Sequence, residues 1–314
     1  MAYFTAPCRR PHDAGRPIAF ALALVMTMPV AWAQERKLGP DVRLHEIASE
    51  FVSRPRQVIV WLPPGYESER DRRYPVLYMH DGQNVYVDWR IDEIARALIA
   101  SKEIEPLIMV LVSNGGRAQD RFEDYTWTKP AEAPAGGKAE VYGRMLVEEL
   151  KPSIDEAYRT LSGAADTAVG GASLGGIVSL YLGLKYPNVF GKLAVMSPAV
   201  WWDDKVIVRE VARFESRPAS RIWLDVGLAE PKSMVANTKE LRQALIRNGW
   251  TVGTDLIYFE LPGGRHDEPS FARRAGDMLK YLFPPKPARS ALGGASRGTS
   301  APPSRCDQAV ACGT

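Results

Sequence analysis

Strand-like and helix-like segments alternate along most of this chain, and this alternation constrains its fold more than any other feature. Short apolar runs rich in β-branched residues are followed repeatedly by segments with the spacing of an amphipathic helix. Such an order is typical of a largely parallel sheet, because helices form the crossovers between parallel strands and cover both faces. The sequence therefore predicts an α/β architecture.

Eight strands and six helices are expected from these patterns. The strands are expected at 42–51, 57–62, 76–79, 107–112, 167–170, 192–197, 221–226 and 256–261. The helices are expected at 91–99, 141–158, 174–186, 206–214, 233–248 and 270–282. The first two strands have no helix between them, so we expect an antiparallel pair at one edge. Residues 114–138 show no regular period and are interpreted as a lid-like loop or a mobile insertion.

A glycine-rich segment follows the fifth predicted strand and precedes a helical pattern. Its sequence, Gly-Ala-Ser-Leu-Gly-Gly at 171–176, contains G-x-S-x-G. In that context the motif indicates a nucleophile elbow, a sharp turn that exposes the serine hydroxyl. A structural glycine-rich turn is the alternative. We predict that Ser173 is a nucleophile and that the Leu174 N–H is an oxyanion donor. The strand order then fits an α/β-hydrolase with a mostly parallel eight-stranded sheet and helices on both faces.

A serine nucleophile needs a base, and histidine has a suitable pKa. His266 lies after the last predicted strand, where the base of such hydrolases occurs, although it could also be an ordinary loop residue before a helix. The acid is expected after the seventh strand, where two carboxylates occur. We favour Glu230, which lies in the loop, over Asp225, which lies within the strand pattern and could instead accept backbone N–H bonds.

The second oxyanion donor is expected after the third strand. Gly82 and Gln83 follow a His-Asp pair at this place, and the N–H of either residue could face the pocket. An ordinary Asp-Gly turn is the alternative interpretation.

Two clusters are candidates for substrate binding. Trp201 and Trp202 could line the pocket that binds an aromatic or acyl group, or could pack in the core. Arg121 could pair with a substrate carboxylate or catecholate, or could form a surface ion pair with Glu123 or Asp124.

Several classes of ligand are not expected. The sequence lacks H-E-x-x-H, a cysteine cluster and G-K-[ST], so neither a metal nor a nucleotide cofactor is implied. The formal net charge is only +3 and no basic stripe with interleaved aromatic residues occurs, which argues against a nucleic acid partner. Beyond residue 33 the sequence contains no apolar run long enough to predict a membrane span. A small-molecule ester is the expected partner.

The N-terminal residues 1–33 have the three parts of a secretory signal. Arginines precede an apolar run at 18–30, which ends in Ala-Trp-Ala before Gln34. We therefore expect a periplasmic or secreted protein whose catalytic domain spans 34–284. Cys8 would be removed with the signal.

The C-terminal residues 285–314 are rich in Pro, Ala, Gly, Ser and Arg and are interpreted as a disordered tail. Cys306 and Cys312 lie in this tail, where a disulfide between them is possible in an oxidising compartment. The predicted folded core contains no cysteine, which excludes a cysteine nucleophile there.

Taken together, several segments resemble the putative esterase family, in particular its enterobactin-esterase-like branch. The matching segments are 78–86, 121–125, 171–176, 186–191 and 197–202. The resemblance covers most of 42–282 and implies an α/β-hydrolase that uses Ser173 and His266, with an acid at the Glu230 position and no cofactor. Enterobactin esterases hydrolyse a siderophore trilactone, and feruloyl esterases are more distant relatives. An acyltransferase on the same fold and a non-catalytic siderophore- or glycan-binding protein are the alternatives.

Overall fold

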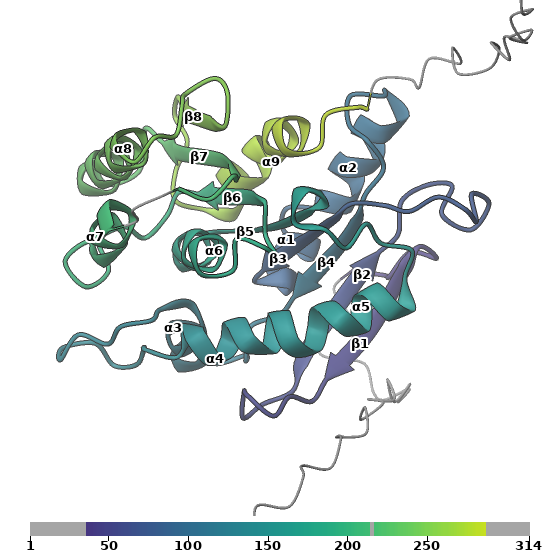
Figure 1. Ribbon diagram of the computed structural model, residues 1–314, viewed down its shortest axis with the longest axis horizontal. Coiled ribbons are helices and arrows are strands. Elements are labelled where there is room, and N and C mark those ends of the chain that lie inside the picture. Colours follow the sequence, from purple (N-terminus) through teal and green to yellow (C-terminus); the bar gives the residue numbers. More distant parts are fainter. Residues whose placement is uncertain (1–35, 214–216, 287–314) are drawn as a thin grey trace, which may run out of the picture.

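A computed structural model describes residues 36–213 and 217–286, in which eight strands form one sheet (Figure 1). The strands are β1 (Val42–Ile47), β2 (Arg56–Trp61), β3 (Val76–His80), β4 (Ile108–Val112), β5 (Thr167–Ala172), β6 (Lys192–Met196), β7 (Arg221–Gly227) and β8 (Leu256–Leu261). Their order is β1-β2-β4-β3-β5-β6-β7-β8. The β1–β2 and β2–β4 pairs are antiparallel and the others are parallel. The predicted mostly parallel sheet and its antiparallel edge pair are confirmed.

Helices cover both faces of the sheet (Figure 1). They are α1 (Gly82–Val87), α2 (Ile91–Ala100), α3 (Ala118–Tyr125), α4 (Ala139–Arg144), α5 (Lys151–Ala157), α6 (Leu174–Lys185), α7 (Val206–Arg213), α8 (Lys232–Arg247) and α9 (Glu268–Leu282). A π-helical turn, Met145–Leu150, joins α4 to α5, so the helix expected at 141–158 is one continuous stretch. The six predicted helices are therefore present with small shifts at their ends.

Two of the observed helices differ from the sequence-based expectation. The interpretation of 114–138 as wholly irregular is wrong, because α3 lies within it. This helix is mostly polar and is held by tertiary contacts. Tyr125 is buried, and the carboxylate of Asp124 forms a buried ion pair with Arg56 of β2 at 2.8 Å. The six-residue α1 is too short to display a helical period.

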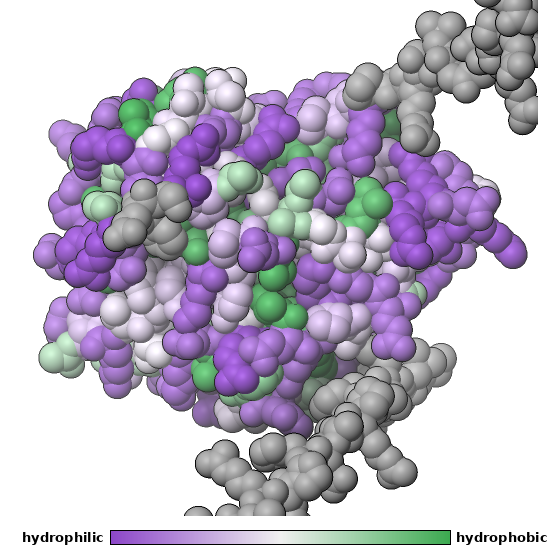
Figure 2. Space-filling model, in the orientation of Figure 1, coloured by the Kyte–Doolittle hydropathy of each residue, from purple (hydrophilic) through white to green (hydrophobic). Residues whose placement is uncertain are grey.

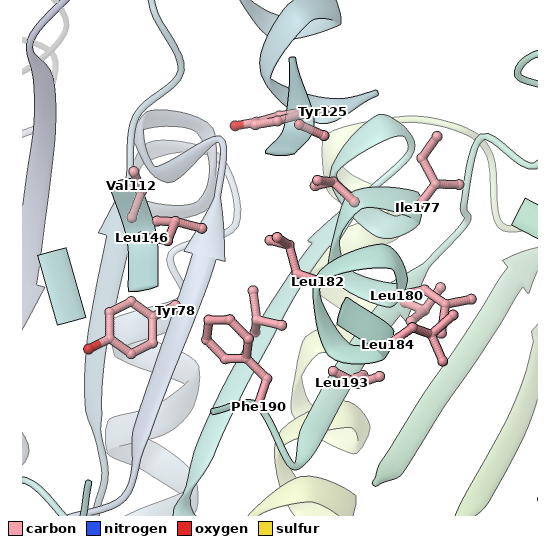
Figure 3. Packing of buried hydrophobic residues seen from close by; sticks show 14 of the residues in the cluster. Tyr78, Val112, Tyr125, Leu146, Ile177, Leu180, Leu182, Leu184, Phe190 and Leu193 are labelled. Carbon is pink, nitrogen blue, oxygen red and sulfur yellow. The ribbon is translucent and has the colours of Figure 1, made fainter. Parts of the chain in front are cut away.

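Alternate side chains of the central strands enter two separate cores. Val58, Val60 and Tyr78 belong to the core beneath α3–α8. Figure 3 shows part of this core, where Leu182 and Leu184 of α6 lie close to Phe190 and to Leu193 of β6. Ile59 and Trp61 instead face the second core beneath α1, α2 and α9. This two-sided burial follows from the period-two alternation of a strand and explains the nearly continuous apolar runs.

The face of the molecule seen in Figure 2 is mostly hydrophilic, with hydrophobic residues in small separate patches. None of the helices formed by residues 36–213 and 217–286 is long and apolar enough to cross a bilayer. The predicted signal, residues 1–33, lies outside the described residues, as do Cys8, Cys306, Cys312 and nearly all of the predicted tail. Lys286, close to the start of that tail, lies 3.0 Å from a Glu105 carboxylate oxygen.

A close backbone contact fixes the start of β6. The N–H of Gly191 donates to the carbonyl oxygens of Ala164 and Thr167, at 2.9 and 3.2 Å. A Cβ atom added at Gly191 would lie 2.4 Å from the Ala164 carbonyl oxygen. The contact involves backbone, which cannot rotate aside as a long side chain can.

We therefore expect Gly191→Ala to lower the free energy of unfolding by about 1–3 kcal/mol, the usual cost of overpacking. Gly163→Ala is the matched control, because a Cβ atom there has nothing within 4 Å. Urea titration followed by circular dichroism measures both variants. Equal stabilities would contradict the proposed backbone clash.

Candidate active site

Ser173 lies in the sharp turn between β5 and α6. Its φ of 61° and ψ of −120° place it in a strained region for a residue with a side chain. The backbone around it is held firmly, since the Ser173 N–H donates to Met196 O at 3.0 Å and its carbonyl accepts from Ala199 N–H at 2.9 Å. A Cβ atom at Gly171 would lie 3.1 Å from the backbone of Gly175, so glycine permits the close approach of strand and helix. The turn has the geometry expected of a nucleophile elbow.

Two helices begin beside each other at the carboxyl edge of the sheet. Leu174 is the first residue of α6, after β5, and Gln83 is the second residue of α1, after the neighbouring β3. Within residues 36–213 and 217–286, neither of their backbone N–H groups has a hydrogen-bond acceptor, as is usual in the first turn of a helix. Both groups therefore remain available as hydrogen-bond donors at this edge.

Gly82 is needed for close packing and not for a left-handed backbone. The positive φ of 53° in this turn belongs to Asp81 rather than to Gly82. A Cβ atom at Gly82 would lie 2.4 Å from the Leu111 carbonyl carbon. Glycine therefore lets α1 begin directly against the backbone of β4.

Arg121, on α3, binds Asp81 with two nitrogens. Its Nε lies 3.0 Å from Oδ1 and its Nη2 lies 2.9 Å from Oδ2 of that carboxylate. The alternative ion pair with Glu123 or Asp124 is not formed. Arg121 thus lies beside the elbow with much of its charge already balanced.

A cavity of about 30 Å³ opens next to Ser173. It is lined by His80, Asp81, Asn84, Val85, Trp89, Arg121, Ala172, Ser173, Glu268 and Phe271. The Glu268 carboxylate accepts hydrogen bonds from Asn84 Nδ2, at 3.0 Å, and from Trp89 Nε1. The cavity has both polar and apolar lining and has room for only one or two water molecules.

Trp201 and Trp202 have different environments, and neither lines this cavity. Trp202 is 3% exposed and packs in the core, and its Nε1 donates to Thr128 Oγ1 at 3.2 Å. The core-packing alternative therefore describes Trp202. Trp201 is 48% exposed and remains accessible from solvent.

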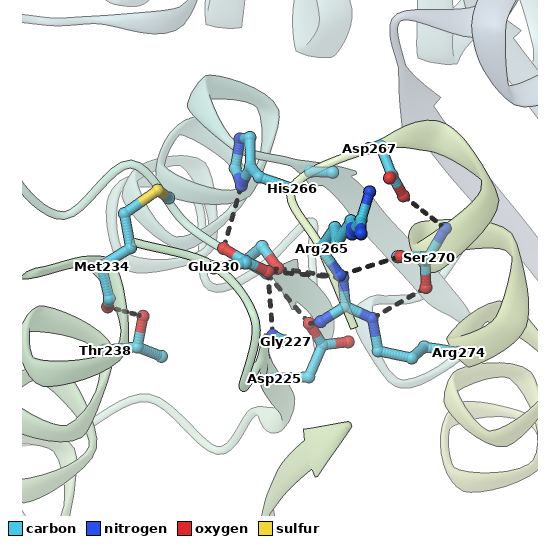
Figure 4. A network of polar contacts seen from close by, with 12 residues as sticks. Asp225, Gly227, Glu230, Met234, Thr238, Arg265, His266, Asp267, Ser270 and Arg274 are labelled. Carbon is cyan, nitrogen blue, oxygen red and sulfur yellow. Dashed lines mark hydrogen bonds and ion pairs between the residues drawn. The ribbon is translucent and has the colours of Figure 1, made fainter. Parts of the chain in front are cut away.

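Glu230 and His266 meet across the loops after β7 and β8 (Figure 4). His266 Nδ1 lies 2.9 Å from Glu230 Oε2. The other carboxylate oxygen, Oε1, accepts the Gly227 N–H at 2.8 Å and the Ser197 hydroxyl. Burial by itself would raise the pKa of Glu230, but the hydrogen bonds from His266, Ser197 and Gly227 outweigh it and lower that pKa.

Asp225 has other partners than His266. It is fully buried, and its Oδ1 accepts the Ser197 N–H at 3.0 Å and Arg274 Nη1 at 2.7 Å. Its Oδ2 accepts Trp223 Nε1 at 2.7 Å. The structure therefore brings Glu230, and not Asp225, to His266.

His266 is linked to the elbow through Phe271. The two rings are in edge contact, with centroids 5.2 Å apart, and Phe271 lines the cavity beside Ser173. No hydrogen bond joins Ser173 to His266 among the described residues. Catalytic hydrogen bonds of this kind often tighten only when substrate binds.

The family model described as putative esterase matches residues 49–271. The chain belongs to the putative esterase family. This membership supports ester hydrolysis, and the fold is that of an α/β-hydrolase.

Relatives of this esterase differ in how fully they align. Protein YbbA of Bacillus subtilis, which is uncharacterized, is 23% identical over 247 residues, covering 75% of this chain and 95% of the relative. The iron(III) enterobactin esterase of Escherichia coli K12 is 26% identical over 239 residues, covering 73% of this chain and 54% of that enzyme. Among solved structures, BES protein from Bacillus cereus has a TM-score of 0.67 at 21% identity, covering 79% of this chain and 97% of the other.

Three site residues of the esterase were not singled out from the sequence: His80, Ser197 and Arg274. His80 and Ser197 lie at the carboxyl ends of β3 and β6, and a polar residue at that edge is the signal that could have indicated them. Arg274 is a charged residue on the buried face of α9. Within residues 36–213 and 217–286, no three His, Cys, Asp or Glu side chains are gathered as metal ligands.

His80 is buried at the edge of the cavity, and its Nδ1 lies 2.8 Å from Tyr142 Oη. Burial lowers the pKa of His80 from 6.5 to about 4, with smaller opposing effects of Asp81, which raises it, and Arg121, which lowers it. The unfolded chain thus accepts a proton more readily than the folded one. The stability that neutral His80 contributes is complete above pH 6.5 and is lost as the pH falls toward 4.

We expect His80→Asn, whose side-chain amide can still bond to Tyr142, to reduce this pH dependence. Between pH 7 and pH 4.5 the free energy of unfolding should fall by about 2 kcal/mol less in the variant than in the wild type. Urea titrations at the two pH values provide the measurement. A stability difference between the two proteins that does not vary with pH would contradict the assignment.

Proposed function

We propose that this esterase is a secreted serine carboxylesterase that works through an acyl-enzyme. Ser173 would be the nucleophile, His266 the base and Glu230 the acid. The observation that carries the proposal is the strained elbow at Ser173, which lies at the same sheet edge as the Glu230–His266 pair. The secretory part of the proposal depends on the sequence of residues 1–33.

The reaction follows from the roles of these groups. As Ser173 Oγ attacks the ester carbonyl, His266 Nε2 takes its proton, and Glu230 stabilises the resulting imidazolium. The N–H groups of Leu174 and of Gln83 or Gly82 would bind the oxyanion. The imidazolium then gives its proton to the departing alcohol, leaving an acyl-Ser173. A water molecule activated by His266 repeats these steps and releases the acid.

For the substrate, we propose a siderophore lactone or an aryl or acyl ester. The enterobactin esterase relative supports the first, and a relative named endo-1,4-beta-xylanase/feruloyl esterase supports the second. The cavity beside Ser173, at about 30 Å³, is too small to enclose such a molecule. Most of the substrate would lie across the open sheet edge, where Trp201 could contact an aromatic ring and Arg121 a negatively charged oxygen.

Ser173→Ala should abolish hydrolysis of a p-nitrophenyl acyl ester and should prevent labelling by a fluorophosphonate, because it removes the proposed nucleophile. Ser68→Ala is the control, since Ser68 is an exposed serine in the loop between β2 and β3. Retained activity or labelling in Ser173→Ala, with an unchanged circular dichroism spectrum, would refute the nucleophile.

Substitutions of Glu230 and Asp225 should have different effects. Glu230→Gln should lower kcat/KM by about a thousandfold or more, because the imidazolium loses its negative partner. Asp225→Asn should chiefly destabilise the fold, by about 3 kcal/mol or more, because it leaves the buried Arg274 without a counter-charge. Kinetics and urea titration of both variants separate these effects. High activity in Glu230→Gln would assign the acid elsewhere.

A further inference from the structure

Arg274 lies on α9 with its guanidinium entirely buried. Its Nη1 donates to Asp225 Oδ1 at 2.7 Å and its Nε to Ser270 O at 3.1 Å (Figure 4). Its Nη2 donates to Ser197 Oγ at 2.9 Å. A buried guanidinium needs a counter-charge, and Asp225 supplies it. Glu230 is therefore left with a negative charge that Arg274 does not fully balance.

The guanidinium determines which way the Ser197 hydroxyl points. Arginine has only hydrogen-bond donors, so Ser197 Oγ must accept from it. The single hydroxyl proton of Ser197 is then free to be donated to Glu230 Oε1. The backbone is fixed as well, because the Ser197 N–H donates to Asp225 at 3.0 Å.

The direction of the Ser197 hydroxyl affects which nitrogen of His266 carries the proton. Glu230 Oε1 accepts from both Ser197 Oγ and the Gly227 N–H, which favours the ionised carboxylate. An ionised carboxylate can only accept, so the contact at 2.9 Å requires His266 Nδ1 to carry a proton. In the neutral imidazole, Nε2 is then unprotonated, as a base must be.

We propose that Arg274 and Ser197 are positioning residues that act through Glu230 to hold His266 in the tautomer with its proton on Nδ1. This proposal rests on the proposed function and assigns a chemical role to two residues that do not contact the reacting atoms. Arg274 Nη2 is 3.8 Å from Glu230 Oε1, so Ser197 stands between the guanidinium and the carboxylate.

The same helix also holds the base. Asp267 caps α9 by accepting the Ser270 N–H at 2.9 Å, and the Arg265 N–H donates to Ser270 Oγ at 2.9 Å. The loop that carries His266 is thus anchored to the first turn of α9. Arg274 follows one turn later and acts on Glu230 through Ser197, so a single helix orients both partners of the pair.

The test uses Ser197→Ala and the double variant Arg274→Met/Asp225→Asn, which removes the guanidinium without leaving an unpaired Asp225 charge. Ser220→Ala is the matched control, because Ser220 is also buried but lies just before β7, and its hydroxyl has no hydrogen-bond partner among the described residues. In each protein, ¹⁵N NMR of the imidazole nitrogens at a pH where His266 is neutral reports which nitrogen is protonated. Steady-state kinetics with a p-nitrophenyl ester gives kcat and KM.

In the wild type and in Ser220→Ala, we expect the His266 proton on Nδ1. In the other two variants a larger fraction should carry it on Nε2, and kcat should fall about tenfold with little change in KM. An unchanged tautomer ratio in Ser197→Ala overturns the proposal, and this variant alone decides if the double variant does not fold. If the wild type hydrolyses no ester, the proposed function fails, and the NMR result still decides the positioning role.

Discussion

The loops after β7 and β8 touch through their backbones, and the arrangement of the site depends on this contact. A Cβ atom at Gly227 would lie 2.3 Å from the Gly264 carbonyl oxygen. That oxygen accepts the Ala229 N–H at 2.8 Å, and the Leu261 carbonyl accepts the Leu228 N–H at 2.9 Å. Because no side chain separates the loops, two residues 36 positions apart in sequence form one hydrogen-bonded pair.

Much of the site could be predicted because parallel strands end at a common edge. The G-x-S-x-G motif located the turn at Ser173, and chain order located His266 after the last strand. The preference for Glu230 rested on its place beyond Gly227. The structure supplies the physical reason for the different environments of the two carboxylates: Asp225 is still within β7 and is enclosed by donors, whereas Glu230 lies past the end of the strand.

What could not be predicted depends on contacts between residues distant in sequence. Nothing near Arg121 indicates that Asp81, 40 residues earlier, would be its partner. Arg274 contacts Ser197 across 77 residues. In the same way, α3 has too few apolar residues for a helical pattern and is stabilised by burial of its last turn against the sheet. Local periodicity reports which face of an element is buried, but it does not report polar partners.

The buried ion pair between Asp124 and Arg56 bears on how ligands reach Ser173. To swing α3 outward, the molecule would have to separate two charges that are shielded from water and pull Tyr125 out of the core. The helix that carries Arg121 is consequently held against β2 by this ion pair and by the burial of Tyr125. If the proposed substrate binds beside Arg121, selection among esters would then depend on complementarity to a preformed surface, with little contribution from closure around the bound molecule.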